Sequence, residues 1–434
     1  MGDLHLALLG HGTVGAEVAR LLYVHRDEYQ ARVGRRLNVK TILVQNRAKH
    51  LKPAFPGALV VESLDAVAND PAVEIAVEVM GPLESSNRAV TRCLEAGKHV
   101  VTANKALLAE RGRTLFAVAK RHERTIAFEA SVGGGIPLIA ALGDSLASNK
   151  ITGVAGILNG TTNYILSAMH RDNVEYGAAL KEAQAKGFAE ADPTLDVQGA
   201  DAAQKLAIVA RLAFGAWIDY RDIPRAGIEG LSSSEIEYAK ELGYTIKLIA
   251  RGRSDGERFE LRVAPTLLPK SHSLAHVADE NNALQITGDA VGNVFLAGKG
   301  AGGSATASAV VSDILGVASG RLSRSFAHFG LEGDRQGAPA YSRESFSPSR
   351  FYLRFAIRDE PGVLAQIASA LGRHGISISS VIQHEVPDDA PASDGVPLVI
   401  MTHHALERAV RTALQEADAL PVVSRPTVCL HVSD

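Results

Sequence analysis

The sequence predicts an α/β protein with a Rossmann-type nucleotide-binding domain, an α+β domain, and a C-terminal ferredoxin-like domain with βαββαβ order. Short apolar runs alternate with helical patterns over residues 1–150, and the glycine motif GHGTVG follows the first of these runs. Residues 350–434 then form a separate pattern of strands and helices. A chain of 434 residues is too long for one ordinary core, so several domains are expected.

The alternation in residues 1–150 predicts a mostly parallel sheet with helices on both faces. The expected strands are residues 4–9, 38–44, 74–80, 98–102 and 125–128. The expected helices are residues 13–23, 63–69, 85–96 and 105–121. A glycine-rich run at 298–303 opens a small-residue helix, and we expect residues 298–318 to complete this first domain.

Residues 151–318 predict a second domain in which helices come first and strands follow. The expected helices are 160–170, 175–185 and 200–214, and the strand-like segments are 244–252, 257–267 and 284–296. Residues 319–349 are rich in Ser, Arg and Gly and predict a linker.

The last domain, residues 350–434, has strands expected at 351–357, 376–384, 397–402 and 427–432. A helical stripe runs from Leu364 to Leu371, a second helix is expected at 405–418, and an acidic Pro/Ala loop precedes the third strand. This order can cover one face of a four-stranded sheet with two helices.

Composition excludes several classes of protein. A net charge of −3 without a dense Lys/Arg run argues against a nucleic-acid partner. Cys93 and Cys429 are far apart, so neither a disulfide framework nor a zinc site is expected. No apolar run approaches the roughly 20 residues of a membrane span, and the N-terminus lacks the basic region of a signal peptide. We therefore expect a soluble cytoplasmic protein without a membrane partner.

The motif at residues 10–15 predicts a dinucleotide site. Gly10 permits a tight turn, Gly12 lets the backbone approach a pyrophosphate, and Gly15 lets the helix pack on the strand. The helix that begins at Thr13 offers free N–H groups to the phosphates. The second strand ends without an acid, and Arg47 and Lys49 follow it. This favours NADP over NAD, although both residues could equally be solvated loop charges.

Three segments predict the substrate end. Lys105 follows a strand at the sheet edge where ligands bind in such folds. Asp201 and Lys205 share one helix face, and Lys205 lies on the apolar stripe, which suggests a task for this lysine. The glycine run in residues 129–137 could curl its carbonyls around a cation, but spacing alone favours a plain tight turn.

Over nearly its whole length the chain resembles homoserine dehydrogenases. The segments that carry the resemblance are GHGTVG (10–15), TANKALL (102–108), EASVGGGIPLI (129–139), GILNGTTNYIL (156–166), AKGFAEADPTLDVQGADAAQKLAI (185–208), ELGYTIKLIA (241–250) and GKGAGGSATASAVVSD (298–313). Residues 358–385 are similar to the ACT domain, a module that senses amino acids.

The resemblance implies reduction of L-aspartate 4-semialdehyde to L-homoserine with NADPH or NADH, within threonine, methionine and isoleucine biosynthesis. It makes residues 151–318 the substrate-binding and dimerisation domain. It implies Lys205 as proton donor and Lys105 as its orienting neighbour, with these two roles open to exchange. It implies the following further site residues: Gly187, Glu190 and Asp201 for substrate; Thr13, Val14, Lys105, Gly302 and Gly303 for cofactor; and carbonyls of Glu129, Val132, Gly134 and Ile136 for a structural sodium ion.

The ACT resemblance implies feedback regulation, with L-threonine as the leading effector. Pairing two such sheets at their edges predicts a homodimer or homotetramer. Two alternatives stay open at this point: a dehydrogenase of another amino-acid semialdehyde, and a non-catalytic sensor that binds a nucleotide and an amino acid.

Overall fold

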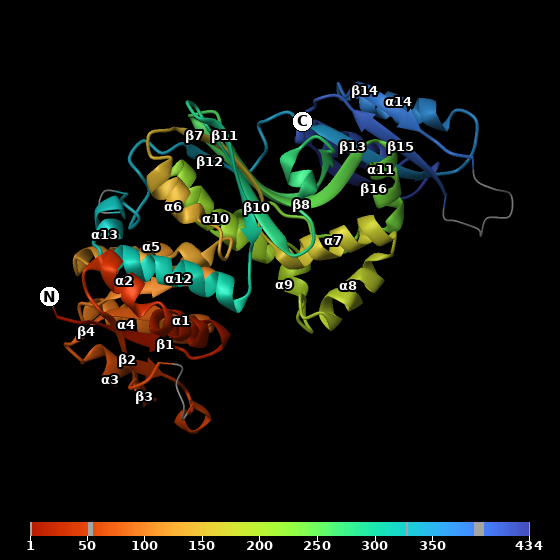
Figure 1. Ribbon diagram of the computed structural model, residues 1–434. Helices are drawn as coiled ribbons and strands as arrows, with labels where there is room; N and C mark the ends of the chain where they lie inside the picture. Colours follow the sequence, from red (N-terminus) through yellow and green to blue (C-terminus); the bar gives the residue numbers. More distant parts are fainter. Residues whose placement is uncertain (1, 51–54, 327–328, 386–394, 434) are drawn as a thin grey trace.

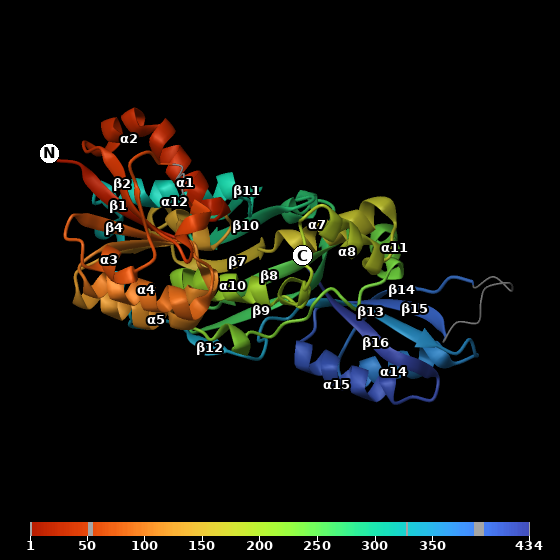
Figure 2. The same cartoon turned by 90° about the horizontal axis from the view of Figure 1, so that it is seen from below.

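The computed structural model describes residues 2–50, 55–326, 329–385 and 395–433. The N-terminal part lies at one end of the molecule and the C-terminal part at the other, with the second part between them (Figure 1). The same order is visible from below (Figure 2). In the described part, no helix is both long and apolar enough to cross a bilayer.

The N-terminal part is a six-stranded parallel sheet in the order β3-β2-β1-β4-β5-β6. Its strands are β1 (Leu4–Leu9), β2 (Leu37–Leu43), β3 (Leu59–Val61), β4 (Val73–Glu78), β5 (His99–Thr102) and β6 (Ile126–Ala127). Its helices are α1 (Thr13–Val24), α2 (Arg26–Val33), α3 (Leu64–Ala68), α4 (Leu83–Glu95) and α5 (Lys105–Arg121). The order reverses between β1 and β4, which is where such sheets bind ligands.

A late segment completes this first part, because α12 (Gly303–Ala318) packs against α1. Buried residues of α12, such as Val310 and Ile314, share one core with Leu6 and Leu8 of β1. Two elements were not expected. α2 buries none of its residues, so it has no apolar stripe to detect, and β3 is a short strand at the edge of the sheet.

The second part combines helices with a mixed sheet. Its strands are β7 (Ile151–Ile157), β8 (Tyr244–Ser254), β9 (Arg258–Pro269), β10 (Asn281–Gly288) and β11 (Gly292–Lys299). Its helices are α6 (Leu138–Ala140), α7 (Gly160–Asp172), α8 (Tyr176–Ala185), α9 (Thr194–Val197), α10 (Ala200–Phe214) and α11 (Ser233–Glu241). Short 3₁₀ or π turns occur at Glu129–Ser131, Ala141–Ser145, Tyr220–Asp222 and Ser273–His276.

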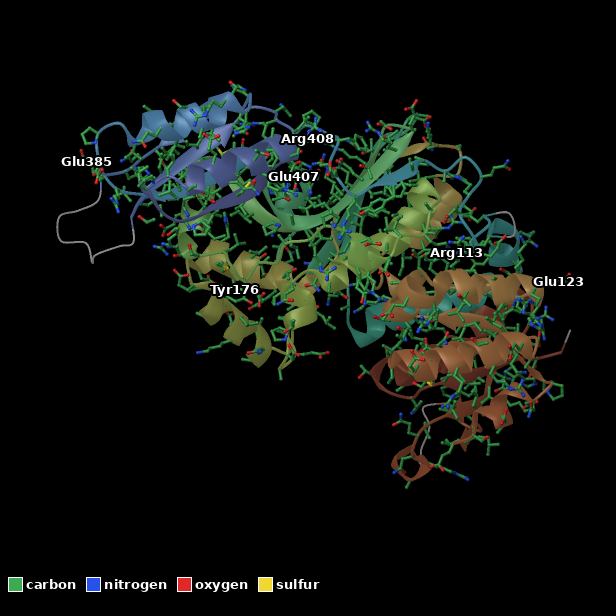
Figure 3. The ribbon with its side chains drawn as sticks, turned by 180° about the vertical axis from the view of Figure 1, so that it is seen from behind. Arg113, Glu123, Tyr176, Glu385, Glu407 and Arg408 are labelled. Atoms are coloured by element: carbon green, nitrogen blue, oxygen red, sulfur yellow. The ribbon has the colours of Figure 1, made fainter. Side chains whose placement is uncertain are left out.

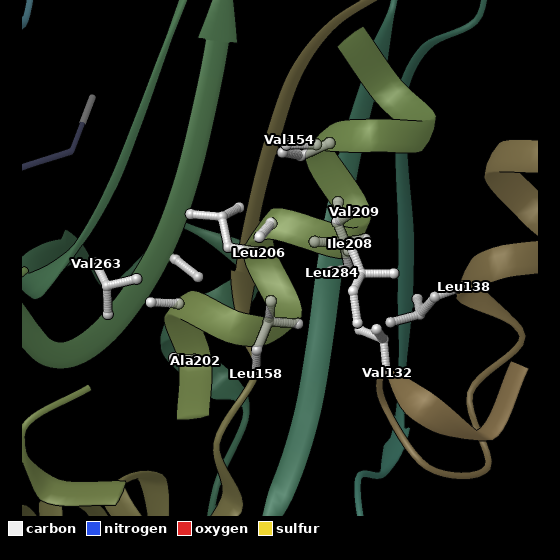
Figure 4. Packing of buried hydrophobic residues seen from close by; sticks show 14 of the residues in the cluster. Val132, Leu138, Val154, Leu158, Ala202, Leu206, Ile208, Val209, Val263 and Leu284 are labelled. Atoms are coloured by element: carbon white, nitrogen blue, oxygen red, sulfur yellow. The ribbon is translucent and has the colours of Figure 1, made fainter. Parts of the chain in front are cut away.

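Helix α10 is the centre of this part, because all of its residues are buried. Leu206, Ile208 and Val209 pack against Val154 of β7 and Leu284 of β10 within one core (Figure 4). Such burial on every face is typical of a helix enclosed by other elements. It explains why Asp201 and Lys205, which lie on α10, are removed from solvent.

In this region β7, α6, α9 and α11 were not expected, and β7 precedes the helices that were expected to come first. Two further expectations were wrong. The segment 284–296 is not one strand but two, β10 and β11, which pair antiparallel as a hairpin. Gly292, with φ of +71°, lets the chain reverse there. Residues 319–349 are not a bare linker, since they contain α13 (Arg321–Phe326) and β12 (Ala340–Ser342), and β12 pairs with β9.

The C-terminal part has the expected βαββαβ order. It consists of β13 (Arg350–Ile357), α14 (Val363–Arg373), β14 (Ile378–Ile382), β15 (Val396–Thr402), α15 (Glu407–Asp418) and β16 (Val423–Val432). Residues of both helices, such as Ile367 and Val410, share a core with Phe355 and Leu398 of the sheet. Most of the acidic Pro/Ala loop lies outside the described residues.

The sequence predicted a separate C-terminal sheet, but in the structure this sheet is joined to the sheet of the second part. Strand β16 pairs in parallel with β9, His431 opposite Thr266 and Val432 opposite Leu267. The two sheets therefore form one sheet of ten strands that runs from β11 to β14. The pairing covers an edge of each sheet that would otherwise expose unpaired backbone groups.

Candidate functional site

A cavity of about 610 Å³ lies at the carboxyl ends of β1, β2 and β4, lined in part by Gly10 and Gly12. Gly10 has φ of +105°, and a Cβ there would lie 2.8 Å from the carbonyl oxygen of Val79. A Cβ on Gly15 would lie 2.4 Å from the carbonyl oxygen of Gly10. Larger residues would push strand and helix apart at both positions, so the close packing here requires glycine.

Two helices begin side by side near this cavity. α1 begins at Thr13 and α12 at Gly303, and a Cβ on Gly303 would lie 2.9 Å from Thr13 Cγ2. Gly302 precedes α12 with φ of +105°, which suits glycine. Ser304 Oγ also donates a hydrogen bond to Glu17 at 3.1 Å. The structure thus brings Thr13, Gly302 and Gly303 together, and two adjacent helix N-termini favour an anionic group.

The cavity is lined by charges of both signs, Glu62 and Arg88, and Arg47 lies outside this lining. Arg47 is exposed in a short 3₁₀ helix (Arg47–His50), and its backbone N–H donates to Glu62 Oε1 at 2.7 Å. Glu62 and Arg88 line the cavity, and neither was singled out in the sequence. Both belong to elements whose approach to β2 only the fold reveals. The side chain of Lys49 lies outside the described part.

A buried network fixes the start of α5, where Lys105 lies. Glu78, fully buried at the end of β4, accepts hydrogen bonds from Thr102 Oγ1 at 2.6 Å and Ser86 Oγ at 2.8 Å. Thr102 Oγ1 accepts the Asn104 N–H at 3.0 Å, and the Asn104 side chain caps α5 through the Leu107 N–H at 3.1 Å. These bonds tie two strand ends to the helix that presents Lys105.

Lys105 meets α10 of the second part. Its Nζ lies 2.6 Å from Asp201 Oδ1, while Lys205 Nζ lies 2.8 Å from Asp201 Oδ2. Lys205 Nζ also donates to the carbonyl oxygen of Leu158 at 2.7 Å. The three residues singled out in the sequence thus form one cluster, in which a single buried carboxylate holds two ammonium groups.

The charge of Asp201 depends on the two lysines, and the charge of Lys105 depends on Asp201. Burial opposes ionisation of Asp201, but the two lysines outweigh it and hold the pKa of this carboxyl well below its usual range. Burial likewise disfavours a charged Lys105, yet the Asp201 carboxylate raises the pKa of Lys105 above its usual value. Lys105 and Asp201 are therefore both charged at neutral pH.

Two further polar residues belong to the cluster and were not predicted. Asn159 Nδ2 lies 2.8 Å from Asp201 Oδ2 and 2.7 Å from Asp196 Oδ1, while its Oδ1 caps α7. Burial, followed by the charge of Asp201, raises the pKa of Asp196. Asn159 lies immediately before a helix and within the family-like segment 156–166, but neither signal gave this side chain a role.

The loop after α8 lies close to this cluster. Gly187 ends the helix with φ of +77°, and Thr161 Oγ1 donates to the carbonyl oxygen of Phe188 at 2.7 Å. Glu190 is exposed, and its charge contributes to the raised pKa of Lys105. Glu190 thus acts on Lys105 from the solvent-facing side of the cluster, and Gly187 belongs to the same loop.

The glycine run near residue 133 is sharply curled. Gly133 and Gly134 have φ of +75° and +57°. Both carboxylate oxygens of Glu129 accept backbone N–H groups, from Ile139 and Ala140 at 2.8 Å each. No group of three His, Cys, Asp or Glu side chains within the described residues could hold a metal. A cation here would depend on carbonyl oxygens, such as those of Val132, Gly134 and Ile136.

Comparisons with known proteins cover the whole chain. A family model described as the homoserine dehydrogenase NAD binding domain matches residues 10–129, and one described as homoserine dehydrogenase matches residues 137–315. An ACT domain model matches residues 351–421.

Relatives match at full length. The chain is 39% identical to a homoserine dehydrogenase of Neisseria gonorrhoeae, covering 100% of the chain and 99% of that protein. A solved homoserine dehydrogenase of Thiobacillus denitrificans superposes with a TM-score of 0.92 at 37% identity, covering 100% of the chain and 98% of that structure. A hyperthermophilic archaeal homoserine dehydrogenase in complex with NADPH has a TM-score of 0.60 at 25% identity, covering 73% of the chain and 97% of that structure.

Proposed function

The chain belongs to the homoserine dehydrogenase family of NAD(P)-dependent oxidoreductases, and from this premise we propose how its own residues reduce L-aspartate 4-semialdehyde to L-homoserine. The observation that carries the proposal is the cluster in which Asp201 holds both Lys105 and Lys205. It lies where α5 of the nucleotide-binding part meets α10 of the substrate part.

NAD(P)H, when bound, supplies the hydride that adds to the aldehyde carbon. The oxygen of that aldehyde then gains negative charge and needs a proton. We assign Lys205 as the proton donor. It is buried, and its ammonium donates to two acceptors, Asp201 and the Leu158 carbonyl. Its third N–H is left for the substrate. Lys105 is less buried and provides a second positive charge that orients the substrate.

The carboxylates have a complementary task. Asp201 keeps both lysines in place, and Asn159 fixes Asp201 in turn. Glu190, at the exposed side, supplies a negative group for the substrate's ammonium. Gly187 gives the loop its left-handed turn beside this group. A non-catalytic sensor would have no use for two lysines held on one buried carboxylate.

For the cofactor we propose NADP, with NAD as an accepted alternative. Arg47 follows β2 in the short 3₁₀ helix, in the region where a 2′-phosphate would be recognised, and Arg88 is the positively charged residue among those that line the cavity. Glu62 opposes this preference, because a carboxylate can bond the free ribose hydroxyls of NAD. The NADPH bound by the archaeal relative is consistent with NADP.

We also propose a sodium ion at the curled glycine run, held by carbonyl oxygens of Glu129, Val132, Gly134 and Ile136. Carbonyl donors suit a hard cation, and the left-handed Gly133 and Gly134 allow several of them to converge. The ion would rigidify the backbone between the nucleotide-binding part and α6 and would take no part in the chemistry.

The ACT domain supports regulation by an amino acid, and we propose L-threonine, the end product of a pathway that this reaction would feed. We further propose an oligomer of at least two chains. Strands β11 and β14 end the ten-stranded sheet, and each has an exposed apolar side chain, Phe295 and Val381 respectively. A second copy paired there would cover both the backbone edge and the side chain.

The direct experiment compares the oxidation of several substrates with NADP and with NAD. Purified protein should oxidise L-homoserine with NADP at least as well as with NAD, and should leave L-serine and L-aspartate unreacted. A preference for any other amino alcohol or for L-aspartate would overturn the proposed substrate.

A further inference from the structure

A second cavity, of about 420 Å³, lies where the ACT domain joins the substrate part. One wall comes from α15 and β16, and the other from β9 and the segment 224–231. We call it the junction pocket. Its volume is within the range of small-molecule sites, which begins at about 300 Å³. It lies inside one chain and is separate from both the nucleotide cavity and the lysine cluster.

The junction pocket contains a half-buried ion pair that links the two parts. Arg262 Nη2 of β9 lies 2.6 Å from Glu407 Oε2 of α15, and Arg262 Nη1 lies 2.7 Å from His431 Nε2. The side chains of Arg262 and Glu407 are 16% and 27% exposed, so both remain reachable from the pocket. Glu407 is visible at this junction in Figure 3.

Apart from Arg225 and Arg411, which also pairs with Glu407, the remaining wall is largely apolar. Val263, Val410 and Leu414 line it beside the ion pair. A cation, an anion and an apolar surface in one small cavity match the three parts of an α-amino acid. The carboxylate would bind Arg262 as a bidentate partner, the ammonium would bind Glu407, and the side chain would lie against Leu414.

The pocket also contacts the segment that leads into the lysine cluster. The Ala226 N–H donates to the carbonyl oxygen of Val263, and the Ile228 N–H donates to that of Val197, at 2.9 Å each. A Cβ on Gly227 would lie only 2.4 Å from the Val197 carbonyl oxygen. Val197 follows Asp196 directly, and α10 with Asp201 begins three residues later. Movement of the 224–231 segment therefore reaches the start of the catalytic helix.

We propose that the junction pocket binds an α-amino acid between Arg262 and Glu407, and that this binding alters the lysine cluster through residues 224–231. The proposal rests on the amino-acid regulation proposed above and names its site within a single chain. For the ligand to regulate the enzyme, it must bind two arrangements of this segment with unequal affinity. Separation of Arg262 from Glu407 provides the second arrangement.

Cys429 offers a readout that does not depend on activity. It is exposed and lines the junction pocket, whereas Cys93, the other cysteine of the chain, is fully buried. The rate at which a thiol reagent labels Cys429 in the native full-length protein should fall about tenfold when L-threonine saturates the site, since the reagent then reacts with the unoccupied fraction. D-Threonine and glycolate, which lack the matched geometry or the ammonium, should protect far less.

Two variants and one control test whether the protection of Cys429 and the inhibition by L-threonine both arise from the junction pocket. Leu414→Trp should fill the pocket while it leaves the ion pair intact, and Glu407→Gln should remove the ammonium partner without change of shape. Both should keep the turnover measured without effector and should lose the protection of Cys429 and the inhibition by L-threonine. Arg408→Trp, on the exposed side of the same helix, should behave as wild type.

The outcomes separate the site from the regulation. Inhibition of the wild type that persists in both variants, with no protection of Cys429, would overturn the site and leave amino-acid regulation standing. Absence of both protection and inhibition for threonine and for every other proteinogenic amino acid would overturn both. Protection without inhibition would support the site and overturn its coupling to the lysine cluster.

Discussion

At the scale of single residues, Lys247 is a buried lysine outside the lysine cluster. Its Nζ donates to Asn163 Oδ1 and to the Val277 carbonyl oxygen at 2.8 Å each, and to Ser167 Oγ at 3.2 Å. These partners belong to α7 and to the segment after β9. Burial lowers the pKa of Lys247 to about 8. The residue stabilises the packing of α7 on β8, but its charge is costly.

We predict that stability rises with pH because of this lysine. The native pKa of about 8 lies below the usual 10.5, so between these values the unfolded chain binds the proton and the native chain does not. Wild type should therefore gain up to about 3 kcal/mol relative to Lys247→Met across this interval. Urea unfolding of both proteins at intervals from pH 7 to the alkaline limit measures the difference. A difference that does not change with pH would contradict the assigned burial.

Sequence alone could identify Lys105, Asp201 and Lys205, but not their neighbours. Asp201 and Lys205 are four residues apart, and a helix places them on one face. Lys105 follows a strand at the edge of the sheet where ligands bind, which the sheet topology predicts. Asn159 binds carboxylates 37 and 42 residues away in the chain, and no local pattern reports such contacts. Glu62 and Arg88 were missed for the same reason.

At the scale of elements, the position of α5 depends on Glu78. This carboxylate accepts bonds from the Met80 N–H, Ser86 and Thr102, and Thr102 in turn holds the residue that caps α5. An ionised carboxylate only accepts hydrogen bonds, and all three of these bonds use it as the acceptor. An amide at this position would direct an N–H₂ group toward one of them.

We predict that Glu78→Gln lowers kcat about tenfold, because displacement of α5 by a fraction of an ångström misplaces Lys105 relative to Asp201. The Michaelis constant for L-homoserine should rise, while affinity for the dinucleotide changes little. The matched control is Glu74→Gln on the same strand, where the carboxylate pairs with Arg35 at the surface and is 40% exposed. Equal kinetics for both variants would show that Glu78 does not position Lys105.

Sequence patterns predicted most elements, and the failures have physical causes. The α2 helix was missed because the two apolar residues that it packs on the core, Tyr29 and Val33, are too few to form a recognisable stripe. The sequence pattern predicts one strand where β10 and β11 form a hairpin, because both strands continue the same alternation through a short turn. The bounds of α5 were predictable because its apolar stripe faces a core, and those of α10 because an unbroken helical pattern runs from Ala200 to the glycine that follows Phe214.

At the scale of the whole molecule, the ACT domain and the substrate part share more than the β9–β16 pairing. Glu235 of α11 is fully buried, and its carboxylate binds Arg354 of β13 through Oε1 and Ser232 through Oε2. Removal of Arg354 would leave a buried carboxylate without its cation. The sequence could predict both domains, but not this junction, because its partners are 119 residues apart.

We predict that Arg354→Met lowers the free energy of unfolding of the whole chain by about 3 kcal/mol, the scale for a broken buried ion pair. Arg408→Met, an exposed change in the same domain, should leave it nearly unchanged. Calorimetry should show one transition for the wild type, since the ten-stranded sheet couples the two parts. Two separate transitions in the wild type, or equal stability of both variants, would contradict this coupling.

The most direct test of the proposed mechanism is the turnover of Lys205→Ala with L-homoserine and NADP. In this direction the reaction runs in reverse, and the neutral amine of Lys205 accepts the proton of the substrate hydroxyl as hydride leaves for NADP. Its loss should lower kcat by about 10²-fold or more, while the dissociation constant of the dinucleotide, measured by fluorescence titration, stays near that of wild type. Lys181→Ala, an exposed lysine of α8, should retain full turnover. If the kcat of Lys205→Ala lies within a few-fold of wild type, Lys205 is not the proton donor and the proposed mechanism is wrong.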